Sequence, residues 1–119
     1  MPDKAWKAFE RRIAKSLGTV RTPLSGIPSR HTSSDTLHPD LYVECKQRKT
    51  SLLHGLFIPI RRQAKVENKV PVLAYHRKGS PNTLAVIDWS FFLKLWNMAG
   101  DWVSEHEGTA PLHELWGKD

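Results

Sequence analysis

The sequence predicts an α/β domain with a mixed central sheet flanked by helices. Apolar residues recur at helical spacing near the amino terminus, short runs of strand-forming residues follow, and helical segments separate those runs. The resulting order is helix, strands, helix, strand, strand, helix. With 119 residues the chain is long enough to bury one core. We therefore expect residues 1–119 to form a single domain, with 101–119 as an acidic carboxy-terminal tail.

The first element is predicted to be a helix that Asp3 caps and Gly18 ends. Its apolar stripe consists of Trp6, Phe9, Ile13 and Leu17. Glu10 lies about 40° from Trp6 around the helix axis, which places an acid inside this stripe. The prolines, glycine and serines of residues 19–34 then indicate one short extended piece followed by a loop.

Residues 34–38 and 41–46 are strand-like runs on either side of Pro39 and Asp40, and a proline in this position favours a chain reversal. The prediction is a hairpin. Alternation along its second strand puts Glu44 and Lys46 on one face, and Cys45 on the other. Pairing outward from the turn places Asp35 directly opposite Glu44.

Two facing carboxylates about 4.5 to 5.5 Å apart at Cβ repel one another. A divalent cation with oxygen ligands relieves that repulsion, and Mg²⁺ is commonly held by one or two carboxylates, waters and substrate phosphate. Asp40 is about 13 Å from Glu44 along the extended chain. Asp40 is therefore expected to be a turn residue, and Asp35 the functional acid.

The second half of the chain begins with a connecting segment, residues 50–57, after which Pro59 is expected to open a helix through about Lys69. Residues 70–76 are nearly all apolar and predict a central strand buried on both faces. A turn at 77–82 leads to a strand over 83–89. A helix over 90–100 follows, with Ser90 as its cap.

Charge is distributed unevenly along the chain. Residues 1–80 hold 16 Lys or Arg and 6 Asp or Glu, whereas residues 81–119 hold 2 and 6. A basic body of this kind indicates a polyanionic partner, most commonly nucleic acid. Candidate phosphate contacts surround the acidic hairpin or lie on the helix after it: Arg21, Ser25, Arg30, His31, Arg48, Lys49, Arg61 and Arg62.

The single cysteine excludes an internal disulfide and favours a reducing compartment. The amino terminus has charges where a signal peptide needs an apolar run, and no stretch approaches the roughly 18 apolar residues of a membrane span. We expect a cytoplasmic protein without a membrane partner, in a bacterial, archaeal or phage-infected host cell.

The pattern D-x8-ECK at residues 35–46, preceded by a helix with an inward Glu10, resembles the PD-(D/E)XK nuclease superfamily. The resemblance covers about Trp6 to His76, roughly 60% of the chain. The helical Glu10 is similar to that of archaeal-type and phage Holliday-junction resolvases and of VRR-type nucleases, and Gln63 is similar to a polar residue that many members place on the following helix. Two departures are the short spacing from Asp35 to Glu44 and Ser34 in place of the proline.

This resemblance implies a restriction-endonuclease-like core and Mg²⁺-dependent hydrolysis of DNA phosphodiesters, with Mn²⁺ able to substitute. The implied metal ligands are Glu10, Asp35 and Glu44, and the implied catalytic set adds Lys46 and Gln63. Lys46 would orient water or stabilise charge on the transition state. The favoured activity is that of a structure-selective Holliday-junction resolvase in DNA recombination, acting on branched DNA.

A junction has two strands to cut symmetrically, so a small domain with one active site implies a homodimer. Trp96, Trp102 and Trp116 are candidates for the dimer contact. Two alternatives stay open: a restriction-type or homing endonuclease on duplex DNA, and a non-catalytic nucleic-acid-binding module with a nuclease fold.

Overall fold

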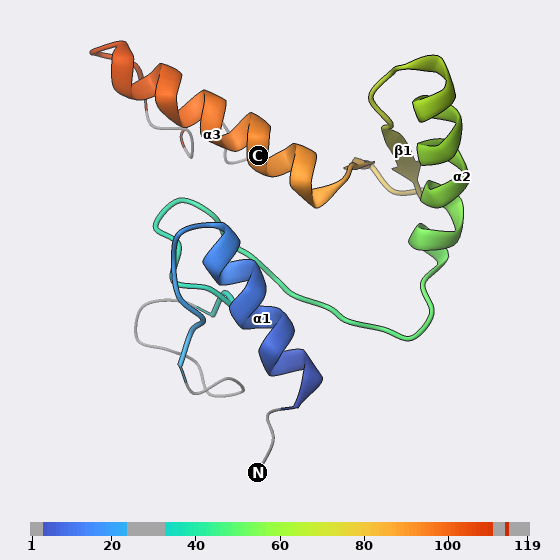
Figure 1. Cartoon of the computed structure of the whole chain (residues 1–119), viewed down its shortest axis with the longest axis horizontal. Helices are drawn as coiled ribbons and strands as arrows, with labels where there is room; N and C mark the ends of the chain where they lie inside the picture. The colour runs from blue at the N-terminus through green and yellow to red at the C-terminus, as the bar shows by residue number, and fades with distance from the viewer. Residues whose placement is uncertain (1–3, 24–32, 111–113, 115–119) are drawn as a thin grey trace. The chain divides into compact units, whose positions relative to one another are not determined.

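The computed structural model describes residues 4–23, 33–110 and 114, and it combines helices with a small sheet (Figure 1). Its elements are α1 (Ala5–Ser16), α2 (Leu52–Glu67), β1 (Leu73–His76), β2 (Thr83–Val86) and α3 (Trp89–Glu105). These elements divide between two compact units. One comprises Met1–Gln47 with Trp96–Asp119, and the other comprises Arg48–Leu95. The single domain expected from the sequence stays a prediction.

Helix α1 confirms the first predicted helix. It buries Glu10 and Ala14, which lie four residues apart on one face. Leu17 follows the last helical residue, and Gly18 adopts a positive φ of 71° while its N–H donates to the Lys15 carbonyl. Glycine suits this left-handed position because it has no Cβ to clash. The predicted cap, Asp3, lies outside the described residues.

A short extended piece follows α1, as predicted, and it pairs with the segment that carries Asp35. Arg21 and Thr36 form an isolated antiparallel bridge. The Thr22 N–H donates to the Asp35 carbonyl at 3.0 Å, and the Leu37 N–H donates to the Val20 carbonyl at 3.0 Å. Hydroxyl residues fill the space around this pairing, since Thr22, Ser34 and Thr36 are all buried.

The predicted regular hairpin over residues 34–46 is wrong, because its two arms form no strand ladder and Thr36 of the first arm bridges Arg21 instead. The chain does reverse, because the Asp35 N–H donates to the Val43 carbonyl at 2.8 Å. Side chains, however, take the next bonds: Ser34 Oγ accepts from the Val43 N–H at 2.7 Å, and Asp35 Oδ2 accepts from the Cys45 N–H at 2.6 Å. Ser and Asp compete in this way with backbone pairing.

Helix α2 begins seven residues before Pro59, so the prediction that Pro59 opens the helix is wrong. A proline inside a helix removes one backbone bond and costs about 3 kcal/mol. The turn before it is retained because it carries Phe57, the buried residue of α2. Burial of an apolar side chain is what stabilises most helices in proteins. The helix ends at Asn68, whose φ of 56° is left-handed.

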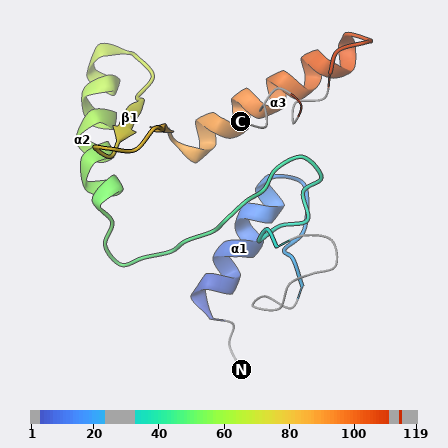
Figure 2. The ribbon, with the colours of Figure 1, turned by 180° about the vertical axis from the view of Figure 1, so that it is seen from behind.

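Strands β1 and β2 pair antiparallel, with Leu73 opposite Val86 and His76 opposite Thr83. Figures 1 and 2 show β1 beside α2, which packs against it. The prediction of a central strand buried on both faces is wrong, because β1 has one partner in the two-stranded sheet and alternates half-buried with exposed residues. Val70 and Val72, which the prediction included, are exposed and precede the strand.

Helix α3 begins one residue earlier and ends five residues later than predicted. Ser90 therefore lies in its first turn instead of capping it, and the carbonyl of Asp88 accepts from the Phe92 N–H at 3.0 Å. The first residues of the expected acidic tail, from Asp101, continue the helix to Glu105. Across the described ranges, no helix combines the length and apolar character needed to cross a bilayer.

Candidate acid site

The candidate acid site consists of Glu10, Asp35, Glu44 and Lys46, all in the unit that contains α1. A continuous series of contacts joins them. Glu10 on α1 binds Arg21, Arg21 pairs with Thr36, and Asp35 accepts a hydrogen bond from Cys45, the residue after Glu44. An ion pair, a backbone bridge and a hydrogen bond thus connect helix α1, the segment of Asp35 and the segment of Glu44.

The buried end of the acid site is the ion pair of Glu10 and Arg21. Arg21 Nε lies 2.5 Å from Glu10 Oε2, and the exposed fractions of the two side chains are 17% and 8%. The Arg21 guanidinium also lies over the Trp6 ring, 5.4 Å from its centroid. Its Nη2 is buried without a hydrogen-bond partner among the described residues. Removing one member of such a pair leaves an uncompensated buried charge, which is costly.

Asp35 forms the centre of the site. Its N–H and carbonyl bond the segments on its two sides, Val43 and Thr22, and its Oδ2 accepts from the Cys45 N–H. Asp35 thus bonds the residues on either side of Glu44, so the prediction that Asp35 lies directly opposite Glu44 is wrong in its register. An ionised carboxylate accepting from a backbone N–H makes a short, strong hydrogen bond.

The exposed end of the acid site is the ion pair of Glu44 and Lys46. Lys46 Nζ lies 3.1 Å from Glu44 Oε1, and the exposed fractions of the side chains are 62% and 50%. This contact confirms that the two side chains share a face. An exposed pair is worth about 0 to 1 kcal/mol. Lys46 can therefore exchange Glu44 for another anion at little cost.

The pKa of Cys45 is affected by burial and by all three acids. Burial and, after it, the negative charges of Asp35, Glu10 and Glu44 together raise the pKa of its thiol from 9.0 to about 11. The raised pKa keeps the thiol protonated at neutral pH, and a protonated thiol is a poor nucleophile. Cys45 is half-buried and unpaired by disulfide, which agrees with a packing role.

The side-chain oxygens of the acid site are the groups that would have to hold a metal ion. Within residues 4–23, 33–110 and 114, no three His, Cys, Asp or Glu side chains form a group that could hold a metal ion. Mg²⁺ requires fewer protein ligands than this, because waters and substrate phosphate complete its shell. Asp35 and Glu44 supply hard oxygen donors of the right kind, whereas Glu10 is committed to Arg21. Asp35 and Glu44 are thus the two carboxylates of the site that would be available to Mg²⁺ together with waters and a phosphate.

The remaining predicted site residues have varied surroundings. Gln63 belongs to the other unit, where it is exposed on α2 and donates to Glu67 at 3.0 Å. Hydrogen bonds from Gln63 and Lys69 lower the pKa of Glu67. Arg61 pairs with Asp88 at 3.0 Å. Exposed side chains are found at Arg48, Lys49 and Arg62. The predicted contacts Ser25, Arg30 and His31 lie outside the described residues.

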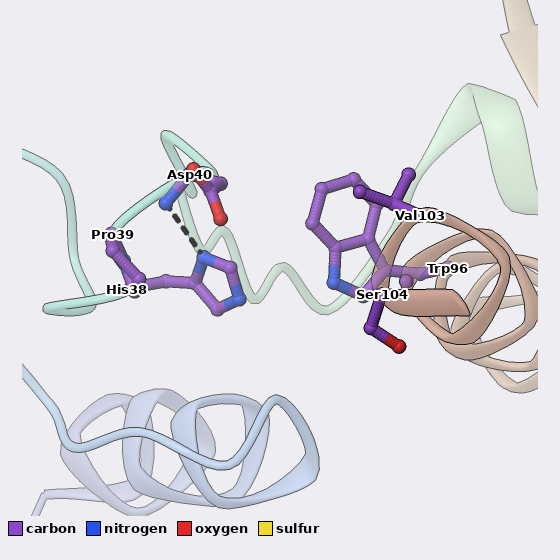
Figure 3. A pocket seen from close by; sticks show the side chains of 7 residues that line it. His38, Pro39, Asp40, Trp96, Val103 and Ser104 are labelled. Atoms are coloured by element: carbon purple, nitrogen blue, oxygen red, sulfur yellow. Dashed lines mark hydrogen bonds between the residues drawn. The ribbon is translucent and has the colours of Figure 1, made fainter. Parts of the chain in front are cut away.

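Asp40 lies apart from these contacts, at a turn. His38 Nδ1 accepts from the N–H groups of Asp40 and Leu41, each at 3.0 Å. Figure 3 shows His38, Asp40 and Trp96 around a cavity of about 320 Å³, which Gly100, Val103 and Ser104 of α3 also line. The rings of His38 and Trp96 meet edge to face with centroids 5.8 Å apart. These contacts place Asp40 in a turn, where the sequence predicted it.

Three residues that position the acids were not singled out from the sequence for this role. Ser34 bonds both backbone groups of Val43, Thr36 is fully buried beside Asp35, and His38 caps the turn. The run of hydroxyl residues around Asp35 was a signal for them, since Ser and Thr often bond nearby backbone.

In comparisons with protein families, with curated proteins and with solved structures, no match to this chain was found.

Proposed function

We propose that the chain is a Mg²⁺-dependent DNA endonuclease of the PD-(D/E)XK type, with a restriction-endonuclease-like core and Holliday junctions as its substrate. The observation that carries the proposal is the series of contacts from Glu10 through Arg21, Thr36 and Asp35 to Cys45. It joins the helix that carries Glu10, the segment that carries Asp35 and the segment that carries Glu44 and Lys46. Such a combination has a chemical use in phosphodiester hydrolysis.

Asp35 and Glu44 would hold the metal ion together with the scissile phosphate. Bound there, Mg²⁺ would polarise the phosphate and lower the pKa of a bound water. Lys46 would leave Glu44 for the phosphate, because their exposed ion pair is weak. Its ammonium would then offset the charge that builds on the phosphate oxygens. The buried Glu10–Arg21 pair would hold α1 against the segment that carries Asp35.

DNA as the substrate is supported by the net charge of +6 and by the basic residues beside the site. Arg48 and Lys49 come two and three residues after Lys46 and are exposed, so they can reach phosphates on a strand that enters the site. The choice of a branched substrate and a homodimer rests on the resemblance and on the need for two symmetric cuts.

The test is cleavage of a labelled panel in Mg²⁺, comprising a four-way junction, a flap, linear duplex and single-stranded DNA. Lys46→Ala is the active-site variant, and Lys78→Ala, at an exposed lysine without a proposed role, is its matched control. Paired symmetric nicks in the junction that Lys46→Ala loses and Lys78→Ala retains are the expected result. Cleavage of duplex or flap alone would remove the junction from the proposal, and no cleavage of any substrate would overturn it.

A second candidate is a non-catalytic nucleic-acid-binding module, and one observation favours it. Each acid already has a partner within the chain: Arg21 for Glu10, the Cys45 N–H for Asp35, and Lys46 for Glu44. Calorimetric titration with Mn²⁺ separates the two candidates. The endonuclease requires binding that Asp35→Asn and Glu44→Gln remove, and the module requires none.

A further inference from the structure

Tyr42 is an aromatic residue beside the acid site that has no part in the proposed chemistry. Residues 41–46 alternate between half-buried and exposed, as in an extended chain, and the exposed residues are Tyr42, Glu44 and Lys46. The ion pair of Glu44 and Lys46 shows that side chains two residues apart lie on one face here. Tyr42 therefore continues this face, about 6.6 Å along the chain from Glu44.

The Tyr42 ring is more open to water than the other candidate aromatic residues of this unit. The exposed fraction of Tyr42 is 67%, against 53% for Trp102. The Trp102 ring is also stacked on His106, with the two centroids 4.0 Å apart, so one of its faces is covered. Trp116 lies outside the described residues. Single exposed apolar residues are common on protein surfaces, so the position and anchoring of Tyr42 must decide its role.

The polar end of Tyr42 is anchored across the chain reversal. Tyr42 Oη lies 3.0 Å from Ser33 Oγ. The next residue of each arm is bonded as well, because Ser34 Oγ accepts from the Val43 N–H at 2.7 Å. These two consecutive bonds fix the start of the segment that carries Glu44. The ring is thus held by its hydroxyl while most of its surface stays in water, and a side chain ordered in advance loses little freedom on binding.

An exposed aromatic ring is complementary to the face of a nucleobase. Every base has such a face, and bases stack on aromatic side chains with little dependence on sequence. In continuous duplex the neighbouring bases cover both faces, so a side chain must first unstack them. An unpaired base is free of this cost. Stacked bases of one strand follow at about 3.4 Å, so a base within roughly two steps of a phosphate at Glu44 can reach Tyr42.

We propose that Tyr42 stacks on an unpaired base of the DNA strand whose phosphate is bound at Glu44 and Lys46. The inference rests on the proposed nuclease function and deepens it, because it specifies the form of DNA that the acid site accepts. Stacking favours a branch point, a flap or a single strand over continuous duplex. Lys46 binds the charge of the strand and Tyr42 binds the base, so the two residues recognise different parts of one substrate.

DNA binding by the full chain in Ca²⁺, measured by fluorescence anisotropy, tests the stacking. Ca²⁺ takes the same oxygen ligands as Mg²⁺, and electrophoresis afterwards checks that the DNA is intact. A single strand is compared with the same sugar-phosphate strand without bases. Tyr42→Leu is expected to weaken binding of the single strand by about fivefold to a hundredfold and to leave binding of the base-free strand unchanged. Tyr42→Phe keeps the ring, and as the matched control it should bind both strands like the wild type.

Equal weakening of both strands by Tyr42→Leu would overturn the stacking, because it would show a loss that does not involve a base. A Tyr42→Phe variant as weak as Tyr42→Leu would also overturn it, as would a wild type that binds neither strand. Circular dichroism checks the folding of each variant. Tyr42→Gln is a second variant without a ring and should show the same selective loss, so the test does not depend on one substitution.

Cleavage in Mg²⁺ is measured separately, so failure of the stacking and failure of the nuclease are distinguishable. A wild type that cleaves DNA but binds the single strand and the base-free strand equally would overturn the stacking alone. A wild type that cleaves nothing, yet binds the single strand in a manner that requires the Tyr42 ring, would overturn the nuclease alone. In a cleaving wild type, Tyr42→Leu should raise KM for the single strand and leave kcat unchanged, because stacking is made before the chemical step and kept through it.

Discussion

The two ends of the acid site have the same kind of ion pair in opposite environments. Glu10 and Arg21 are almost fully enclosed, whereas Glu44 and Lys46 are mostly exposed to water. Water screens the exposed pair and leaves it weak. Water cannot compensate a charge of the enclosed pair in the same way once its partner is lost. The comparison indicates that the buried end maintains the fold and that the exposed end is available to a substrate.

Breaking the buried end is expected to have the largest effect on stability. Arg21→Gln leaves Glu10 charged and enclosed, so it should lower the free energy of unfolding by about 3 to 5 kcal/mol, measured by urea denaturation. The double variant Glu10→Gln/Arg21→Gln removes both charges and should be more stable than Arg21→Gln alone. A loss of under about 1 kcal/mol in the single variant would show that the pair behaves like a surface pair.

Breaking the exposed end should separate activity from stability. Lys46→Ala is expected to lower the cleavage rate by about a hundredfold to a thousandfold, the usual effect of removing one group that stabilises transition-state charge. Its free energy of unfolding should change by less than about 1 kcal/mol. Asp40→Ala is the matched control in the turn and should cleave normally. An inactive Asp40→Ala with an active Asp35→Ala would reverse the assignment of the two acids.

The smallest effect concerns Cys45, which lies between the two ends and whose raised pKa links stability to pH. The unfolded thiol ionises near 9.0, and the folded thiol near 11. The native state therefore holds the proton longer, and stability should fall as pH rises from 9.0 to about 11. Denaturation at several pH values, compared with Cys45→Ala, isolates this contribution from that of the lysines. Asp35→Asn removes one of the charges that raise the pKa of Cys45, so it should narrow the pH range over which stability falls. An identical dependence of stability on pH for the wild type and Cys45→Ala would contradict the role of Cys45.

Local patterns predicted the helices better than the pairing of strands. The apolar stripe of α1 identified both the helix and its inward Glu10, because helical spacing alone fixes which residues share a face. The chain reversal at Pro39 was also predictable, but its register was not, since Asp35 bonds Val43 and Cys45 instead of facing Glu44. The regular hairpin was not, since Ser34 and Asp35 use side-chain oxygens for bonds that a ladder would assign to the backbone.

Other features depend on packing that a single sequence does not display. The partner of Arg21 was not predictable as Glu10, because eleven residues and a helix end separate the two. The strand at residues 73–76 was predicted to be central from its apolar composition, yet it has one neighbour in its sheet. Composition indicates how apolar a strand is, and tertiary contacts decide what covers it.

Pro59 divides α2 into two parts that are joined less firmly than its continuous ribbon suggests. A proline has no N–H for the carbonyl four residues earlier, which belongs to Gly55, and Gly55 is exposed to water. The turns from Leu52 to Ile58 thus hold to the remaining helix by fewer backbone bonds. Their amide hydrogens should exchange with solvent sooner than those after Pro59, and bending of α2 should concentrate at this one point.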